Sequence, residues 1–331
     1  MTVEFPAVPQ PDEPTRAEAR RRHATQAGSL GTLEDLGAWV AACQAACPPR
    51  PFTRARVVIF AGDHGIVAKG VSARTAETTA RLFGTLLEGG GVPNALAAVA
   101  GASLRVVDIA VDADTVDKEF KVRKGSGSID TEDALSEDEV VAALKAGADL
   151  ANAEVDSGAD LLIAGDLGAG VTTPSSVLVA ALTGTEPVAV VGRGSGIDDN
   201  AWMRKAAAIR DALRRARAVL TDPVALLRTS GGADLAAMTG FLAQAAVRRT
   251  PVLLDGLPAA AAALVAEELA PGARSWWLAA HRCAEPAHVI ALDRLNLSPI
   301  LDLHIRLGEA SGALTALPIL QMATRLLTDV A

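Results

Sequence analysis

Aromatic residues are scarce in this chain: they make up 3% of the sequence, and tyrosine is absent. A core without many large rings must pack Ala, Val and Leu closely, which favours layers of helices on a sheet. Half of the residues are hydrophobic and the chain has 331 residues. One large domain or two unequal ones can therefore bury a sizeable core.

Cysteine is also rare, and its pattern does not indicate a cross-linked or metal-bound protein. The three cysteines are Cys43, Cys47 and Cys283. They cannot all pair, and the first two have the four-residue spacing of one helix face rather than of a paired metal knuckle. The trio of His281, Glu285 and His288 has only loose metal-ligand spacing. We expect no disulfide, no metal site and no cofactor.

The chain lacks a dense block of positive charge and a long hydrophobic run. Its formal net charge is -8, from 39 acidic and 31 basic residues. The nearest basic run, Arg16–Arg22, is interrupted by Glu18 and is interpreted as a solvated helix face, so no nucleic-acid partner is expected. The longest alanine-rich stretch, Pro258–Leu264, is too short to span a bilayer. Because the N-terminal segment also lacks the plan of a signal peptide, we expect a cytoplasmic protein with no membrane partner.

Short apolar runs that end in Gly, Asp or His are the strongest structural signal. They are Val57–Ala61, Val106–Val111, Leu161–Ala164, Val188–Val191 and Val252–Gly256. Such runs are typical of buried parallel strands. Helical patterns separate them, for example a capping box at Ser136 and Glu139. The alternation predicts an α/β fold with a Rossmann-like parallel sheet, helices on both of its faces, and a ligand crevice outside the carboxyl ends of the strands.

The two ends of the chain differ from its middle. An amphipathic helix pair is predicted before about Arg50, with a break at Gly28–Gly31, and a final apolar helix is predicted over Ala313–Val330. Helices from both termini are expected to pack together as a small second domain or a dimer surface. The predicted domains are therefore residues 51–305, which form the large Rossmann-like unit, and residues 1–50 with 306–331, which form the small helical unit.

Three glycine-rich segments carry the candidate site. They are Gly165–Thr173, Gly192–Asp199 and Arg306–Ala313. The first two are each predicted to follow a strand, where backbone N–H groups can approach an anion without side chains in the way. With Lys205 downstream of the second segment, a phosphate site is predicted. The third segment places the Glu309 carboxylate between Gly308 and Gly312, where backbone can close around a ligand.

These motifs, taken together, resemble one enzyme family. The segments that carry the resemblance are Gly28–Glu34, Ala61–Val67, Gly70–Ala73, the first two glycine-rich segments, Gly231–Met238, Leu254–Gly256, His281–Pro286 and Arg306–Glu309. In this order they are similar to the nicotinate-nucleotide:dimethylbenzimidazole phosphoribosyltransferases. The resemblance is collinear from about Gly28 to Thr328, and so many ordered motifs are specific for the family.

The resemblance implies a reaction of cobalamin lower-ligand biosynthesis. Nicotinate mononucleotide and 5,6-dimethylbenzimidazole would give α-ribazole 5′-phosphate and nicotinate, with inversion at C1′. It also implies a homodimer that acts on small molecules and needs no metal. A pyridinium is already a good leaving group, so the enzyme has mainly to hold the nucleotide, place the base, and accept the proton that the base loses.

The resemblance assigns roles residue by residue. Glu309 matches the general base, Asp166 matches a residue that can stabilise positive charge on the ribose, and Lys205 matches one that can hold ribose or phosphate oxygens. The positions that match substrate-binding residues are Ser72, Gly168, Gly170, Thr172, Gly194, Ser195, Gly196 and Arg306. His64 and His281 are interpreted as buried structural histidines.

Several positions depart from the family pattern. Asp166 replaces a usual Glu, Val171 a usual Asn, and Ala310 a usual Gly, while Arg74-Thr75 stands where an aromatic residue and a proline are common. These changes leave the acceptor base open. Transfer to another base or to a phenolic acceptor, and a non-catalytic nucleotide-binding homologue, stay as alternatives to the main prediction.

Overall fold

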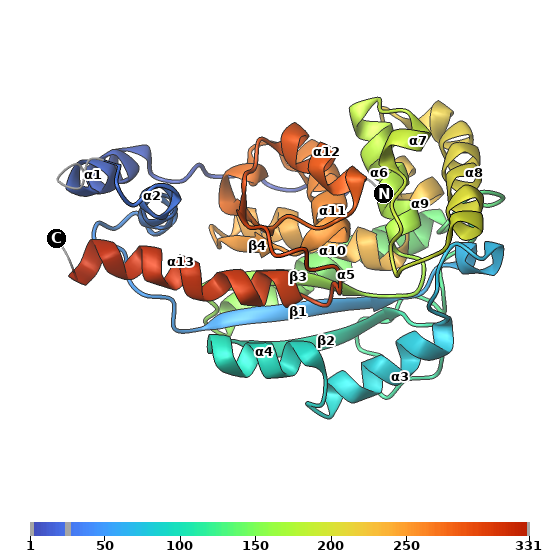
Figure 1. Ribbon diagram of the computed structural model, residues 1–331, viewed down its shortest axis with the longest axis horizontal. Coiled ribbons are helices and arrows are strands. Elements are labelled where there is room, and N and C mark those ends of the chain that lie inside the picture. Colours follow the sequence, from blue (N-terminus) through green and yellow to red (C-terminus); the bar gives the residue numbers. More distant parts are fainter. Residues whose placement is uncertain (1–2, 24–27, 330–331) are drawn as a thin grey trace.

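A parallel sheet forms the centre of the computed structural model, which describes residues 3–23 and 28–329. Within these residues the sheet has six strands in the order β2-β1-β3-β4-β5-β6, and all neighbouring pairs are parallel. The strands are β1 (Ala55–Gly62), β2 (Ser103–Ala110), β3 (Leu161–Leu167), β4 (Val252–Leu254), β5 (Trp277–His281) and β6 (Pro299–Leu301). Figure 1 shows this arrangement.

Helices connect the strands and form the outer layers. The α-helices are α1 (Glu13–His23), α2 (Thr32–Gln44), α3 (Ala76–Leu87), α4 (Val92–Ala100), α5 (Glu137–Asp156), α6 (Thr172–Thr183), α7 (Pro187–Val190), α8 (Asp199–Ala216), α9 (Pro223–Ser230), α10 (Ala233–Val247), α11 (Gly256–Leu269), α12 (Pro286–Leu295) and α13 (Ser311–Asp329). Short 3-10 helices are η2 (Gly65–Lys69), η3 (Arg217–Val219) and η4 (Ala273–Trp276). The predicted capping box is confirmed, because Ser136 Oγ accepts from Glu139 N and the Glu139 carboxylate accepts from Ser136 N.

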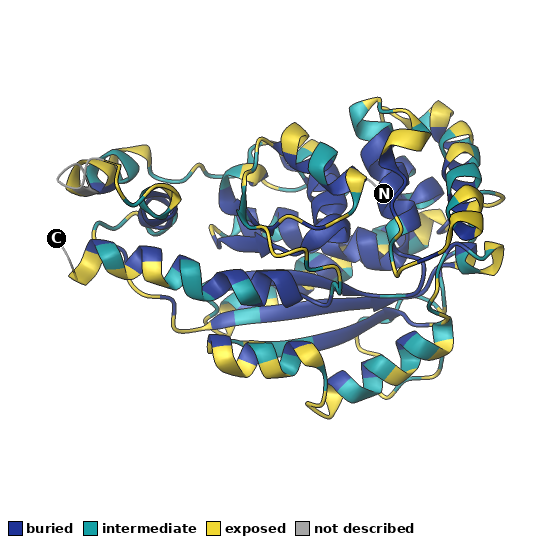
Figure 2. Ribbon diagram, viewed as in Figure 1, coloured by how far each residue is buried: buried dark blue, intermediate teal, exposed yellow. Residues whose placement is uncertain are grey.

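The two faces of the sheet are covered by different helices. Alternate side chains of a strand point to opposite faces. In β1, Val58 and Phe60 join a core with α5, α10 and α11, and Phe60 meets Phe241 of α10 edge-to-face at a centroid distance of 5.3 Å. Val57 and Ile59 join the opposite core with α3, α4 and α13. Figure 2 shows the strands as buried throughout most of their length, so the predicted α/β fold with helices on both faces is confirmed.

One predicted strand is wrong. Residues 188–191 do not join the sheet, because α7 spans Pro187–Val190. Pro187 lies in the first turn of this helix, where its missing N–H costs nothing and its fixed φ suits the helix. The second glycine-rich segment therefore follows a helix instead of a strand. The strands β5 and β6 were not predicted, and they complete the sheet beyond β4.

The helices from the two termini pack together, as the sequence predicts. Ala19 of α1, Ala38 of α2 and Leu327 of α13 share a small apolar cluster. Figure 1 shows α1 and α2 at one end of the molecule, and α13 running from that end toward the middle. Trp39 of α2 also joins the core that α3, α4 and α13 form on one face of the sheet. The division into a large and a small domain stays a prediction. Cys47 lies beyond α2, so it does not share a helix face with Cys43.

None of the described helices is both long and apolar enough to cross a membrane. The end of the predicted final helix at Val330 lies outside the described residues.

Candidate active site

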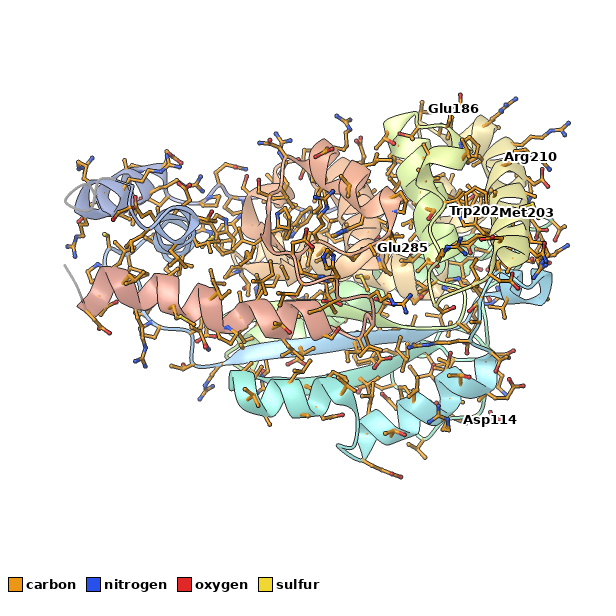
Figure 3. All side chains as sticks on the ribbon, in the orientation of Figure 1. Asp114, Glu186, Trp202, Met203, Arg210 and Glu285 are labelled. Atoms are coloured by element: carbon orange, nitrogen blue, oxygen red, sulfur yellow. The ribbon has the colours of Figure 1, made fainter. Side chains whose placement is uncertain are left out.

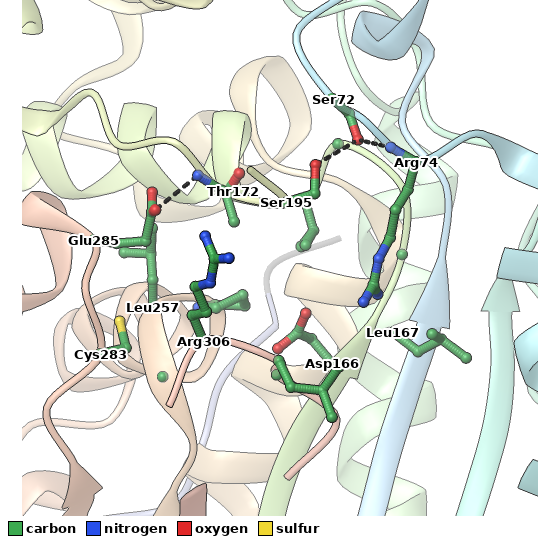
Figure 4. Close-up of a pocket in the computed structure, with 18 of the residues that line it drawn as sticks. Ser72, Arg74, Asp166, Leu167, Thr172, Ser195, Leu257, Cys283, Glu285 and Arg306 are labelled. Carbon is green, nitrogen blue, oxygen red and sulfur yellow. Dashed lines mark hydrogen bonds between the residues drawn. The ribbon is translucent and has the colours of Figure 1, made fainter. Parts of the chain in front are cut away.

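A pocket opens at the carboxyl ends of the strands. It lies next to β1, where the order in which strands are added to the sheet reverses. The chain runs from β1 to β2 on one side and then to β3 on the other side of β1. In open α/β sheets, ligands bind in the crevice at such a point. The lining residues are Ser72, Arg74, Asp166, Leu167, Gly168, Gly170, Val171, Thr172, Gly194, Ser195, Gly256, Leu257, Pro258, His281, Cys283, Glu285, Arg306, Leu307 and Gly308. Figure 4 shows these side chains converging on one space.

The end of β3 delivers Asp166 to the pocket and then turns sharply into α6. The turn depends on Gly168, because a Cβ at this position would lie 1.9 Å from the Gly62 carbonyl oxygen of β1. Gly170 follows with a φ of 86°, a left-handed conformation that L side chains rarely adopt. The backbone at Gly168 and Gly170 therefore approaches the pocket directly, and α6 begins at Thr172 with its N-terminus beside the pocket.

The loop before α13 brings Glu309 alongside Asp166. Glu309 N donates to the Asp166 carbonyl oxygen at 3.0 Å, so the loop is tied to the end of β3. Glu309 and Ala310 both have left-handed backbone, with φ of 57° and 61°. Left-handed backbone is costly for residues other than glycine, and such strain is concentrated at functional sites. At Ala310 the left-handed backbone explains why a glycine is expected there.

The two carboxyl groups are buried in a strongly acidic environment. Asp166 is 9% exposed and Glu309 is 4% exposed. Burial raises the pKa of Asp166 well above its usual value, and the carboxyl groups of Asp255, Glu309 and Asp234 raise it further, while Arg74 opposes the rise. The Oδ1 atom of Asp166 has no hydrogen-bond partner. This side chain is therefore poised to bind a cation or to donate a proton.

Burial also raises the pKa of Glu309, and an ion pair with Arg74 opposes this effect. The Arg74 Nη1 atom lies 3.3 Å from Glu309 Oε1. Arg74 belongs to the loop just before α3, and Figure 4 shows its side chain extending through the pocket in the direction of Asp166. The residue that departs from the family pattern thus meets the predicted general base directly.

Lys205 approaches the pocket from α8, although its side chain is fully buried behind the lining residues. Its Nζ donates to Thr172 Oγ1 at 2.8 Å and lies 3.8 Å from Glu285 Oε2. Burial lowers the pKa of Lys205, and the Glu285 carboxylate opposes this effect. The amine is thus held beside the N-terminus of α6 with part of its bonding capacity unused.

Glu285 closes the same side of the pocket. Its Oε1 accepts from Gly194 N at 2.8 Å, while its Oε2 is buried without a hydrogen-bond partner. Figure 3 labels Glu285 in the interior of the view, and it labels Glu186 and Arg210 at the outer edge of the molecule. Gly194 has a φ of 49°, in the left-handed region that favours glycine. The Gly194 N–H and the Lys205 ammonium, with Thr172 bonded to that ammonium, thus lie on the same side of the pocket as the Glu285 carboxylate.

Two serines join the loops on the opposite rim. Ser72 Oγ lies 3.3 Å from Ser195 Oγ, and Ser195 Oγ also accepts from Ala73 N at 2.8 Å. Gly196 does not line the pocket itself, but a Cβ at that position would lie 3.8 Å from Arg306 Nη1. Arg306 lines the pocket from the loop before α13. The second and third glycine-rich segments thus meet across the opening.

Two buried histidines each lie beside an aspartate, and one of these histidines lines the pocket. His64 Nε2 lies 3.1 Å from Asp234 Oδ2. His281 Nε2 lies 3.4 Å from Asp255 Oδ1, and this oxygen accepts a hydrogen bond from Ala313 N in the first turn of α13. Both histidines are buried, as predicted, but His281 lines the pocket and neither of its ring nitrogens has a hydrogen-bond partner.

Known proteins resemble this chain in sequence and in fold along nearly its whole length. The family model described as "Phosphoribosyltransferase" matches residues 8–331. The chain belongs to this phosphoribosyltransferase family.

Relatives of this phosphoribosyltransferase are similar over their full lengths. The nicotinate-nucleotide--dimethylbenzimidazole phosphoribosyltransferase of Mycobacterium ulcerans (strain Agy99) is 59% identical, over 99% of this chain and 94% of the relative. The enzyme of the same name from Mycolicibacterium paratuberculosis (strain ATCC BAA-968 / K-10) is 60% identical, over 99% and 96%. The crystal structure of CobT from Thermus thermophilus superposes with a TM-score of 0.91 at 37% identity, covering 95% of this chain and 96% of that one.

The chain is accordingly an enzyme of the pentosyltransferase class, and the alternative of a non-catalytic homologue is set aside.

In this phosphoribosyltransferase most of the predicted site residues line the pocket. Asp166, Ser72, Gly168, Gly170, Thr172, Gly194, Ser195 and Arg306 do so. Glu309 and Lys205 reach it through Arg74 and Thr172. Among residues 3–23 and 28–329, no three or more His, Cys, Asp or Glu side chains are placed to hold a metal ion. The three cysteines are free thiols.

The sequence did not identify Glu285 as a pocket residue, because the strand that precedes it has a weak sequence pattern. It follows β5, whose five residues include Ala279 and Ala280 and lack a β-branched side chain. Assigning this strand would have placed Glu285 at the same edge as Asp166. The role of Arg74 could not be found in this way, because its partner Glu309 is 235 positions away.

Proposed function

We propose that the enzyme transfers the phosphoribosyl group of nicotinate mononucleotide to 5,6-dimethylbenzimidazole. The products are α-ribazole 5′-phosphate and nicotinate, and the configuration at C1′ inverts. The names of the relatives and the chemistry of the pocket support this assignment.

The phosphate would bind at the N-terminus of α6. This end of the helix offers backbone N–H groups at Gly170 and Val171, and the helix dipole favours an anion there. Lys205 and Thr172 add an ammonium and a hydroxyl, joined at 2.8 Å. Gly194 N now donates to Glu285 Oε1 at 2.8 Å, and it would become a further donor if that carboxylate turned to accept from a ribose hydroxyl.

Asp166 would face the positive charge of the reaction. Nicotinate mononucleotide carries a pyridinium cation, and positive charge moves onto the ribose as the bond to C1′ breaks. A cation favours the ionised form of a nearby carboxyl group. Substrate binding would therefore offset the acidic surroundings that raise the pKa of Asp166. Charge that is already in place at the developing cation stabilises the transition state.

Glu309 would act as the general base. The acceptor nitrogen attacks C1′ from the face opposite the pyridinium, which accounts for inversion. The azole N–H proton has to leave as the new bond forms, and a positioned carboxylate accepts it. Because burial raises the pKa of Glu309, its affinity for this proton is higher than that of an exposed glutamate.

The observation that carries the proposal is the placement of Glu309 directly beside Asp166, with Lys205 and Thr172 at the other side of the same pocket. The test is to incubate the purified enzyme with nicotinate mononucleotide and each of several bases, and to follow nicotinate release and the anomeric configuration of the product by NMR. We expect release that depends on dimethylbenzimidazole and gives the α-anomer. No release with any base, or a β-linked product, would contradict the proposal.

Arg74 favours a second candidate, which is the same transfer to a different acceptor. Its guanidinium stands where relatives are expected to have an aromatic side chain, and it carries hydrogen-bond donors into the pocket. Acceptors with hydrogen-bond acceptor atoms, such as adenine or a phenolate, would gain from these donors. The same panel of bases distinguishes the two candidates by their specificity constants.

We also propose that the enzyme is a cytoplasmic homodimer in which the helical unit of the two termini contributes to the contact. Sedimentation analysis of the full chain tests the dimer, and cell fractionation tests the location.

A further inference from the structure

Arg74 and Glu309 form an ion pair inside the pocket. Arg74 Nη1 lies 3.3 Å from Glu309 Oε1, and the exposed fractions of the two side chains are 33% and 6%. The guanidinium thus contacts both the open space of the pocket and a carboxylate that is almost fully withdrawn from solvent. An ion pair with one buried partner is screened less by water and salt than a pair on the surface.

The charges that face this carboxylate come from several elements. Asp255 follows β4 and disfavours a second negative charge at Glu309, whereas Arg74 from the loop before α3 favours it. Asp166 of β3 responds to Glu309, Asp255 and Asp234, and Arg74 acts on it as well. Arg74 is therefore the cation that balances both carboxyl groups of the proposed reaction.

The backbone of Arg74 is held while its charged group reaches inward. Arg74 N donates to Ser72 Oγ at 3.0 Å, and Ser72 Oγ lies 3.3 Å from Ser195 Oγ. Ala73 N donates to Ser195 Oγ as well. Two loops thus fix the starting point of the side chain, and the ion pair fixes its end.

We propose that Arg74 is a positioning residue for the phosphoribosyl transfer, which pairs with one oxygen of the Glu309 carboxylate and directs the other oxygen at the acceptor base. The inference rests on the proposed role of Glu309 as general base. Arg74 engages Oε1, so Oε2 is the oxygen that takes the proton of the acceptor N–H. Loss of the guanidinium leaves the buried carboxylate facing only other acids, and the protonated form, which cannot act as a base, is then favoured.

The test compares Arg74→Met, Arg74→Lys and a matched control, Arg81→Met, which removes the same charge from an exposed position in α3. The measurement is kcat/KM for the acceptor between pH 5 and pH 9 at saturating mononucleotide. An opposite charge at this distance shifts a carboxyl pKa by about 1–3 units, and partial exposure of Arg74 favours the lower end.

We expect the acid limb of Arg74→Met to move upward by about one pH unit, which is about a tenfold loss of rate on that limb. At high pH, where Glu309 is ionised in every variant, the rate should fall less than on the acid limb, because only the orientation of the carboxylate is then lost. Arg74→Lys should recover part of the shift, and Arg81→Met should coincide with the parent. An unmoved limb in Arg74→Met, or an equal loss at every pH, overturns the proposal.

A second readout keeps this inference separate from the proposed function. Glutamate labelled with carbon-13 at the side-chain carboxyl reports the titration of Glu309, whose signal is assigned by its loss in Glu309→Gln. A higher titration midpoint in Arg74→Met supports the ion-pair role, and an unchanged midpoint contradicts it, whichever group is the base. If Glu309→Gln stays active, the proposed base fails on its own account. Melting curves verify that each variant is folded.

Discussion

Asp108 in β2 and Asp166 in β3 lie in the two strands that flank β1, and both carboxyl groups are buried. Their hydrogen bonding is opposite. Asp108 Oδ1 accepts from Val111 N at 2.8 Å, and its Oδ2 accepts from Lys121 Nζ at 2.8 Å and from the hydroxyl of Thr115. Asp166 Oδ1 has no partner at all, and burial among other acids raises the pKa of this group.

The lysines near these two aspartates differ in the same way. Lys121 Nζ donates to Asp108, to the Val111 carbonyl oxygen at 2.8 Å and to the Ala113 carbonyl oxygen at 2.7 Å, so all three of its protons are used. Lys205 Nζ donates to Thr172 and, among the described residues, has one carboxylate nearby, that of Glu285 at 3.8 Å.

The contrast separates charges that stabilise the fold from charges that would meet the substrate in the proposed function. A buried charge is tolerated when its partners satisfy it, and it is costly when they do not. At the end of β2 the chain supplies every partner. At the end of β3 partners are missing where the proposed substrate carries a phosphate and a cation.

The largest expected effect is on turnover in Glu309→Gln. The amide keeps the shape of the side chain but cannot accept the acceptor proton, so kcat should fall by about two to four orders of magnitude while the mononucleotide still binds. Steady-state kinetics and a binding titration measure both quantities. A kcat within a few-fold of the parent would remove Glu309 from the mechanism.

Asp108→Asn tests the other side of the comparison through stability. The substitution leaves Lys121 without its counter-charge in a buried setting, and breaking such a pair costs about 3–5 kcal/mol. Denaturant unfolding should show this loss, while KM of the remaining folded enzyme stays close to that of the parent. A loss below about 1 kcal/mol would mean that the Asp108 pair resembles an exposed one.

Lys205→Ala should act mainly on substrate binding. If the ammonium holds the ribose phosphate, KM for the mononucleotide should rise by about 10- to 100-fold, because hydrogen bonds to charged groups contribute about 1.5–3 kcal/mol. KM for the base should change much less. Lys121→Met is the matched control and should lower stability without this difference between substrates. Equal effects of Lys205→Ala on both substrates would contradict the placement.

Asp166→Asn should make the protein more stable as it becomes less active. The folded pKa of Asp166 is raised above its unfolded value, so between these two values the folded state binds more protons and stability falls as pH rises. The amide has no proton to lose. At neutral pH we therefore expect a gain of about 0.5–2 kcal/mol and a flatter dependence of stability on pH above about pH 4. A lower melting temperature at every pH would show that the carboxyl group stabilises the fold.

The smallest effect concerns the acceptor side of the pocket. An aromatic contact is worth about 0.5–1.5 kcal/mol beyond burial. Because Arg74 supplies no such contact, this enzyme should prefer dimethylbenzimidazole over benzimidazole or adenine about three- to tenfold less strongly than a relative with an aromatic residue at this position. Specificity constants for the three bases decide this point. A preference above about a hundredfold would mean that other residues form the wall, and an unchanged ratio in Arg74→Tyr would show that this position does not contact the base.

Among the described residues, the strands β1, β2, β3 and β4 were predictable, and β5 and β6 were not. The runs in β1, β2, β3 and β4 were recognised because Val and Ile suit a buried pleated surface. The Val188–Val191 run has the same composition but forms α7, since Pro187 starts a helical turn. The runs that form β5 and β6 are short and contain Ala or Pro, so neighbouring strands decide their structure.

The sequence by itself determined the parallel sheet, the edge at which glycine-rich turns gather, and the family, because strand composition and ordered motifs are local properties of the chain. Only the tertiary structure decided which buried charges are satisfied. Arg74 and Glu309 are 235 positions apart, and Gly194 and Glu285 are 91 apart. Burial, desolvation and hydrogen-bond partners depend on distances in space, and folding brings such residues together only at the carboxyl ends of the strands.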